Sequence, residues 1–265
     1  MSNFLLISTS LFRERVVPVE QDCILSAENL CKSFRHVKAL RGVSLQARRG
    51  QITAIVGDNG SGKTTLIKIL SGNLRPDSGK ICIENHSFPR LTVCKALGLG
   101  IRTVYQDLSL DNMKNSAENI FLGQEYRKGP FLDRKRMLRE AAALLEEIHV
   151  HIPDLTEPVG NLSGGQRQGV AIARALRNSG SILLLDEPTA AMGIQESHSA
   201  LNILRMLRDR GMTQIIISHN LHQVFSLADH IYVMRSGEVI ASVDTRDSSV
   251  SQLQELILSQ EAIRG

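Results

Sequence analysis

The sequence is poor in aromatic residues: it has no tryptophan, seven phenylalanines and three tyrosines. Proteins that bind single-stranded nucleic acid stack successive bases on aromatic side chains, so this composition argues against such a platform. The excess of basic residues is also small, because 31 Lys and Arg face 27 Asp and Glu for a net charge of +4. Non-specific DNA binding usually takes about 6 to 10 phosphate contacts on one face. With so small an excess spread along the chain, we expect no nucleic-acid partner.

Long apolar runs are missing too, which argues against a membrane span. The aliphatic runs Ile182–Leu185 and Ile215–Ile217 end at polar or charged neighbours, well short of the about 18 consecutive apolar residues of a spanning helix. Phe4–Ile7 has no basic segment before it and no small-residue cleavage site after it, so we expect no secretory signal. The four cysteines lack C-x-x-C or zinc spacing, which indicates buried, reduced thiols of a cytosolic protein. They are Cys23, Cys31, Cys82 and Cys94.

A glycine-rich stretch, Gly57–Thr64, reads GDNGSGKT and matches G-x-x-x-x-G-K-[ST], the pattern of a phosphate-binding loop. The apolar run Ile52–Val56 precedes it and the amphipathic segment Leu66–Leu70 follows it, which is the required order of strand, loop and helix; a plain glycine-rich surface turn lacks this context. Glycines let backbone N–H groups point at phosphate oxygens. We expect Lys63 to reach the β- and γ-phosphates and Thr64 to ligate Mg²⁺.

A second glycine motif, Leu162–Gln166, reads LSGGQ. It precedes a run in which Val170, Ala173 and Leu176 share one helix face. A serine hydroxyl and unobstructed amides at a helix start form an anion site, so the chain carries two phosphate-binding motifs of different design. For this pentapeptide alone, an ordinary glycine-rich helix start stays an open alternative.

Two carboxylates, Asp186 and Glu187, directly follow the aliphatic run Ile182–Leu185. Such a run is typical of a parallel strand buried on both faces. Neighbouring residues of a strand face opposite ways, so we expect separate roles: Asp186 holds Mg²⁺, and Glu187 orients and deprotonates a water molecule. Pro188 then ends the strand.

Two further polar residues follow strand-like runs. Gln106 comes after Ile101–Tyr105, and His219 comes after Gln214–Ser218. The carboxyl ends of strands in an open α/β sheet line the ligand crevice, so we expect both side chains there. Gln106 alone is a weak signal, and a lone histidine is more often structural than a phosphate contact.

The order of these segments predicts an α/β fold: a P-loop NTPase core with a mainly parallel sheet, an antiparallel β subdomain and an inserted α-helical subdomain. We expect an N-terminal extension over 1–23, a nucleotide-binding unit over 24–245 that contains the helical subdomain at about 108–180, and a short helix within 246–265. In the helical part, Asp133 can cap a helix whose apolar residues recur at helical spacing. These residues are Met137, Ala141, Leu144 and Ile148.

Phe34 stands in a polar stretch, Lys32–His36. This setting suits a ring that stacks on an adenine, and an ordinary half-buried strand phenylalanine fits it equally well.

Together, in this order, the motifs resemble the ATP-binding subunit of an ABC transporter over about residues 24–245. LSGGQ is the most specific of them, because other P-loop enzymes lack it. The resemblance implies that ATP lies between two subunits, with the signature motif of one closing on the γ-phosphate held by the other. The implied ATP contacts are Phe34, Gly57, Asp58, Asn59, Gly60, Ser61, Gly62, Lys63, Thr64 and Thr65, with Ser163, Gly164, Gly165 and Gln166 from the second subunit. The implied Mg²⁺ ligands are Thr64, Gln106 and Asp186, and the implied catalytic residues are Glu187, His219 and Gln106.

Three segments are similar to those of bacterial importers of ribose-, fructose- and xylose-type sugars: Val104–Leu110, Asn119–Gly123 and Glu187–Gly193. The resemblance implies an ATPase that energises sugar uptake as a homodimer, held at the inner face of the cell membrane by an integral permease. An extracytoplasmic sugar-binding protein would deliver the solute to that permease. Gly193 departs from the D-loop aspartate of most ABC proteins. The sequence does not name the sugar.

Two alternative hypotheses stay open. One is an ABC ATPase that energises transport of another solute, and the other is an ABC ATPase of the repair or translation type that transports no solute. Repair relatives carry long coiled coils between the motifs and translation factors carry two cassettes, and this chain shows neither. A binding protein without turnover fits poorly with Glu187 and His219.

The stretch 107–124 mixes apolar with polar residues, and we expect it to form an exposed face that docks a cytoplasmic loop of the permease. The apolar residues of this face are Leu110, Met113, Ile120, Phe121 and Leu122.

Overall fold

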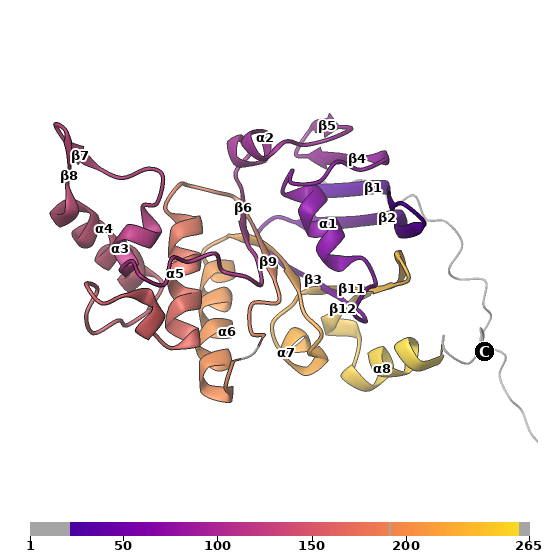
Figure 1. The fold of residues 1–265 in the computed structure, drawn as a ribbon. Helices are drawn as coiled ribbons and strands as arrows, with labels where there is room; N and C mark the ends of the chain where they lie inside the picture. The colour runs from indigo at the N-terminus through magenta and orange to yellow at the C-terminus, as the bar shows by residue number, and fades with distance from the viewer. Residues whose placement is uncertain (1–21, 191, 260–265) are drawn as a thin grey trace, which may run out of the picture.

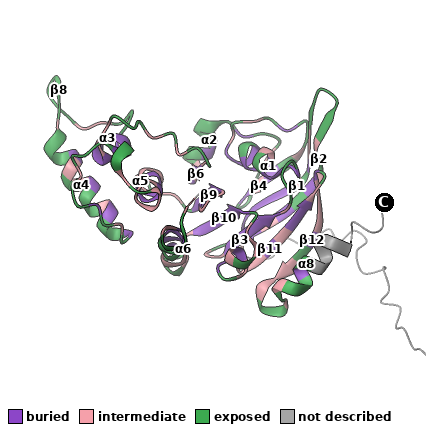
Figure 2. Ribbon diagram, turned by 60° about the horizontal axis from the view of Figure 1, so that its bottom comes forward, coloured by how far each residue is buried: buried purple, intermediate pink, exposed green. Residues whose placement is uncertain are grey.

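A computed structural model describes residues 22–190 and 192–259. Its main sheet has six strands in the order β12-β11-β3-β10-β9-β6, of which β12 alone runs antiparallel to its neighbour (Figure 1). Every residue of β3, β9 and β10 is buried (Figure 2), which explains why most of their residues are aliphatic. The strands are β3 (Ile52–Val56), β6 (Ile101–Val104), β9 (Ile182–Asp186), β10 (Thr213–Ile217), β11 (His230–Arg235) and β12 (Glu238–Asp244). The predicted mainly parallel core is confirmed.

A second sheet is antiparallel, with the order β2-β1-β4-β5. Its strands are β1 (Cys23–Phe34), β2 (Val37–Arg48), β4 (Ser78–Ile83) and β5 (His86–Phe88), followed by the short helix α2 (Val93–Gly98). Helix α1 (Lys63–Leu70) shares a hydrophobic core with apolar side chains of both sheets. The loop that begins this helix is therefore held from two sides.

The segment between β6 and β9 is mostly helical. It contains α3 (Ser116–Ile120), α4 (Arg134–Glu147), the 3-10 turn η2 (Val159–Asn161) and α5 (Gly164–Leu176). Asp133 caps α4 as predicted, because its carboxylate accepts from the Arg136 N–H at 3.1 Å. The sequence did not predict the two-stranded hairpin of β7 (Arg127–Lys128) and β8 (Phe131–Leu132).

The expectation of an exposed apolar face over 107–124 is partly wrong. Ile120 and Phe121 are only 1% and 0% exposed, because α3 turns them toward α4 and α5. The Phe121 ring packs against Tyr126, with 5.1 Å between ring centroids. Met113 and Leu122 do lie on the surface, at 85% and 49% exposure. A docking face in this stretch is therefore limited to the exposed members.

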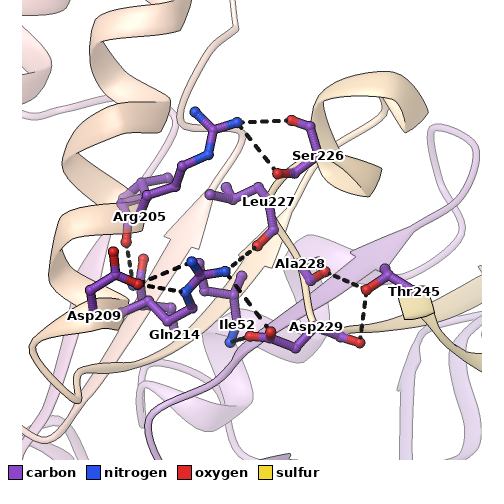
Figure 3. A network of polar contacts seen from close by, with 11 residues as sticks. Ile52, Arg205, Asp209, Gln214, Ser226, Leu227, Ala228, Asp229 and Thr245 are labelled. Carbon is purple, nitrogen blue, oxygen red and sulfur yellow. Dashed lines mark hydrogen bonds and ion pairs between the residues drawn. The ribbon is translucent and has the colours of Figure 1, made fainter.

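The remaining helices are α6 (Ile194–Asp209), α7 (Leu221–Phe225), the 3-10 turn η3 (Thr245–Asp247) and α8 (Val250–Ser259). A polar network around Asp229 joins several of these elements (Figure 3). Its carboxylate accepts from the Ile52 N–H at 2.8 Å and lies 3.9 Å from the Arg208 guanidinium on α6. The start of β3, the strand that leads into the phosphate loop, is thereby fixed to its surroundings.

The expected helix near the C-terminus corresponds to α8, in which Leu253 is buried. Of the expected extension over 1–23, residues 1–21 lie outside the described residues, and β1 already begins at Cys23. All four cysteines are free, but none is buried: Cys94 is exposed and the other three are half-buried, so the expectation of buried thiols is wrong. Within residues 22–190 and 192–259 we find no helix that is both long and apolar enough to span a bilayer.

Candidate functional site

The carboxyl ends of four parallel strands lead into one crevice. Two hollows of about 180 and 440 Å³ share Asn59, Gln106 and Glu187 in their walls. Lys63 and Thr64 line the smaller hollow, and the larger one is lined by His219 among others. The walls are Ala39, Asn59, Gly60, Gly62, Lys63, Thr64, Thr65, Gln106, Glu187 and Ile217 for the first, and Gly57, Asp58, Asn59, Gln106, Glu187, Ala190, His219 and Leu221 for the second. Residues from distant motifs thus meet at one place.

The loop between β3 and α1 requires glycine at two positions. Gly57 has φ +148°, and a Cβ there would lie 2.0 Å from the Met234 carbonyl oxygen. Gly62 has φ +103°, and a Cβ would lie 2.5 Å from the Ala39 carbonyl oxygen. A side chain at either position would force the loop away from these neighbours. The loop therefore depends on glycine, as the pattern of a phosphate-binding loop requires.

Lys63 is held inside this loop. Its ammonium donates to the carbonyl oxygens of Gly57 at 2.6 Å and Asp58 at 2.8 Å, and the residue is only 6% exposed. Burial lowers the pKa of Lys63, while the nearby carboxylate of Glu187 opposes the shift. A cation kept in the cradle by neutral carbonyls is poised to exchange them for phosphate oxygens.

Asp186 ends β9 and is 3% exposed. Its carboxylate accepts a hydrogen bond from Thr64, but its buried Oδ1 has no hydrogen-bond partner among the described residues. Burial raises the pKa of this carboxyl above its ordinary range. A buried carboxylate oxygen without a partner beside a hydroxyl is the donor set that Mg²⁺ takes in phosphate sites, so Asp186 and Thr64 fit this ion.

We expect Asp186→Asn to stabilise the ligand-free protein and to remove its response to Mg²⁺. Burial raises the pKa of Asp186 in the folded chain above that of an unfolded aspartate. At any pH above the unfolded pKa, keeping this carboxyl folded therefore costs stability, and the cost is complete once the pH exceeds the folded pKa. Asparagine has no charge and removes this cost at neutral pH. Each kcal/mol relieved should raise Tm by about 2 to 4 °C. Thermal denaturation with and without ATP and Mg²⁺ measures both effects. A lower Tm of the ligand-free variant would contradict the assigned cost.

The alternation argument assumed that Glu187 continues the strand, but β9 ends at Asp186. The φ of Glu187 is +53°, a left-handed conformation that is uncommon for a residue with a side chain. Its N–H donates to the Ile217 carbonyl at 3.0 Å, which ties the turn to β10. The turn, rather than strand alternation, separates its carboxylate from that of Asp186. Strain of this kind is often kept where a side chain must be aimed.

His219 lies beside Glu187, with 2.8 Å between Nδ1 and Oε2, a distance at which the imidazole N–H donates to the carboxylate. The His219 side chain is 66% exposed, whereas that of Glu187 is 12% exposed. The histidine can therefore swing into solvent or toward a bound molecule without disturbing the core. This arrangement can orient a water molecule and hold a proton.

Phe34 lies outside this crevice lining, near the turn between β1 and β2. The residue is 45% exposed, and the Lys32 ammonium lies 5.7 Å from the ring centroid. Adenine stacking on this ring stays a prediction.

The LSGGQ motif of the same chain does not reach the crevice. Ser163 begins α5, and its hydroxyl accepts from the Gln166 N–H at 3.3 Å while the Gln166 side chain accepts from the Ser163 N–H at 3.0 Å. The motif lines a separate cavity of about 500 Å³, together with His151 and α6 residues. Its helix start therefore lies apart from the chain's own cradle.

Glu196 is a residue that the sequence did not single out. Its carboxylate accepts from the Gly164 N–H at 3.1 Å and from the Gly193 N–H at 3.2 Å, joining the start of α5 to the start of α6. The only sequence signal was its place three residues after Gly193, which is the spacing of a capping box. The link to Gly164 depends on the packing of two helices and has no local signal.

The fold and the crevice define a P-loop ATPase: a glycine cradle with its lysine, a buried carboxylate, and a carboxylate paired with a histidine. The ABC transporter family model matches residues 40–190. The chain belongs to the ABC transporter family and is an ATPase cassette.

Relatives in this family cover most of the chain. The chain is 41% identical over 236 residues to the xylose/arabinose import ATP-binding protein XylG of Sulfolobus acidocaldarius, which covers 89% of this chain and 94% of the relative. It is 39% identical over 239 residues to the fructose import ATP-binding protein FrcA of Rhizobium meliloti, with 87% and 92% covered. The ribose import ATP-binding protein RbsA 2 of Escherichia coli O157:H7 is 39% identical over 225 residues, but the match spans only 44% of its length.

Solved structures agree with this assignment. The ABC transporter cassette MJ1267 in its ADP conformation superposes with a TM-score of 0.77 at 30% identity, covering 91% of this chain and 97% of that one. The cassette MJ0796, described as dimeric and bound to ADP and Pi, has a TM-score of 0.72 at 27% identity, with 84% and 100% covered. The predicted fold and the predicted family are confirmed.

Proposed function

We propose that this chain is the ATP-hydrolysing subunit of an importer that takes up a simple sugar through a separate membrane permease. The observation that carries the proposal is the near full-length similarity to XylG and FrcA, whose names describe sugar import. It is supported by one crevice that brings together five of the candidate ATPase residues, namely Lys63, Thr64, Gln106, Glu187 and His219. The chain would lie at the cytoplasmic face of the membrane, and a sugar-binding protein outside would deliver the solute to the permease.

At the crevice, Lys63 and the loop amides would bind the β- and γ-phosphates of ATP. Thr64, Gln106 and Asp186 would hold Mg²⁺, which neutralises phosphate charge when bound. Glu187 would accept the proton of the attacking water, since its carboxylate is fixed by the turn after β9 and is close to the cradle. His219 would orient that carboxylate through the contact at 2.8 Å.

The second half of each ATP site would come from another copy of the chain. Ser163 and its helix start lie away from the chain's own cradle, so they can act on phosphate only across an interface. The amide groups and the positive end of the α5 dipole would then face the γ-phosphate of the partner. A head-to-tail arrangement of two copies would complete two equal sites, and we propose a homodimer.

Sugar import requires a contact through which the ATPase changes the conformation of the permease. Met113 and Leu122 are the predicted apolar docking residues of 107–124 that are exposed enough to form this contact. We expect Met113→Asp to reduce binding to the permease by roughly tenfold or more, because a charge enters an apolar contact. The ATPase activity of the isolated chain should not change. Phe121→Asp, by contrast, should unfold the helical part, since that side chain is 0% exposed.

The measurement is ATP hydrolysis by the chain together with its permease and binding protein in vesicles. We expect stimulation by a pentose or hexose with the native chain and none with Met113→Asp. Stimulation by a different class of solute, or none by any sugar, would contradict the sugar proposal. Loss of ATPase activity in the isolated Met113→Asp chain would show that the residue supports the fold instead.

A further inference from the structure

The hairpin of β7 and β8 extends from the helical part of the chain and pairs with neither large sheet (Figure 1). Phe131 and Leu132 lie on it with 76% and 43% of their surfaces exposed. Single exposed apolar residues are ordinary, but two adjacent large ones on a projecting hairpin indicate a contact surface. Nothing in the proposed ATPase cycle uses them.

Basic residues surround this apolar tip. The segment Arg127–Arg139 holds six basic residues and one acidic residue, for a net charge of +5 in a chain whose total is +4. The expectation that the basic excess is spread along the chain is therefore wrong. All six side chains are exposed. We call the hairpin patch the set Arg127, Lys128, Phe131, Leu132, Arg134, Lys135, Arg136 and Arg139.

Most of this charge forms no ion pair among the described residues. Arg136 pairs with Glu140 at 2.8 Å, and Arg134 lies 4.0 Å from Glu118. The other four basic side chains of the hairpin patch form no ion pair with any residue in 22–190 or 192–259. Their charges are available to an anionic surface.

The base of the hairpin, unlike its tip, is firmly anchored. The Arg136 guanidinium lies 3.8 Å from the centroid of the Tyr126 ring, which in turn packs on buried Phe121. The Asp133 N–H donates to the Tyr126 carbonyl at 2.8 Å. The tip is therefore presented from a fixed support, which reduces the entropy lost when it binds.

We propose that the hairpin patch binds the anionic headgroups of a lipid bilayer, with Phe131 and Leu132 entering the interface. Clustered Lys and Arg side chains are attracted to anionic lipid, and exposed apolar side chains beside them add burial in the headgroup region. A nucleic acid fits less well, because one aromatic ring offers no series of stacking partners. The proposal rests on the proposed function, which places the chain against the inner face of a membrane.

The test uses the full chain and vesicles without any permease. We expect co-sedimentation with vesicles of phosphatidylcholine mixed with phosphatidylglycerol, little with phosphatidylcholine alone, and weakening as salt rises. Arg127→Gln combined with Lys128→Gln should weaken binding about thirtyfold. Phe131→Ser should weaken it about tenfold.

Two matched controls remove the same groups elsewhere. Arg75→Gln with Arg90→Gln takes two exposed basic side chains from other loops, and Leu97→Ser takes an apolar side chain that is 48% exposed on α2. Both should bind vesicles like the native chain. All variants should keep the native Tm, since none of these side chains is buried.

Absence of binding to the anionic vesicles would overturn the proposal, as would an equal loss in the controls and the hairpin variants. Unchanged vesicle binding of Phe131→Ser with weakened binding to the permease in detergent would assign the tip to a protein contact and also overturn it. Because the vesicles contain no permease, failure of the sugar-import proposal would leave the vesicle result unchanged, and the two failures are distinguishable.

Discussion

Lys63→Ala is expected to lower ATP affinity about 10- to 150-fold, the range of a lost hydrogen bond to a charged group. The cradle holds this ammonium at 2.6 and 2.8 Å from two loop carbonyls, so the charge is already in place when phosphate arrives. The other cation of α1, Lys68, is exposed on that helix and lines neither hollow of the crevice.

Equilibrium binding of a fluorescent ATP analogue measures the effect, with Lys68→Ala as the matched control. The control should bind nucleotide like the native chain. Circular dichroism and Tm check that Lys63→Ala keeps its fold, since the lysine also holds the loop together. Unchanged affinity in a folded Lys63→Ala chain would remove the assignment of this loop as the nucleotide site.

Glu187→Gln is expected to reduce the rate of ATP hydrolysis by about 10² to 10⁴, the usual contribution of a general base. Glutamine keeps the size of the side chain and can accept the His219 contact, but it cannot take a proton from water. The cradle and the Asp186 carboxylate are untouched, so ATP should still bind. Bound ATP would then persist and hold two copies together.

Ser163→Arg in the Glu187→Gln chain is expected to reverse that association. The residue begins α5 and lines a cavity away from the chain's own cradle, so a bulky side chain there blocks only a facing phosphate. Loss of the helix cap costs about 1 kcal/mol, which Ser163→Ala reproduces as a control without the bulk. Binding of ATP to a single chain should be the same in all of these variants.

Much of the fold could be predicted because its central strands are buried on both faces. The run Ile182–Leu185 is aliphatic throughout, and such runs are recognisable without any partner. The residues that follow the strands could be predicted for a related reason, since parallel strands bring their carboxyl ends to one edge. The placement of Asp186, Glu187 and His219 at this edge follows from that geometry, whereas the direction of the Glu187 side chain is set by the left-handed turn after β9.

Other features depend on contacts between distant segments. Phe121 is buried because other helices pack around α3. From the sequence alone, the short apolar stretch that contains it fits an exposed face as well as a buried one. The β7 and β8 strands have two residues each, which is too short for a strand period. The bond from Glu196 to Gly164 needs α6 to pack on α5, and the left-handed turn at Glu187 is held by β10.

The mass of the Glu187→Gln chain in solution, measured by light scattering with ATP and with or without Mg²⁺, tests the central claim most directly. The claim is that the cradle of one copy and the LSGGQ motif of another complete each ATP site. We expect a dimer that requires ATP and is lost on adding Ser163→Arg. A monomer under every condition, including with the permease in detergent, would contradict it.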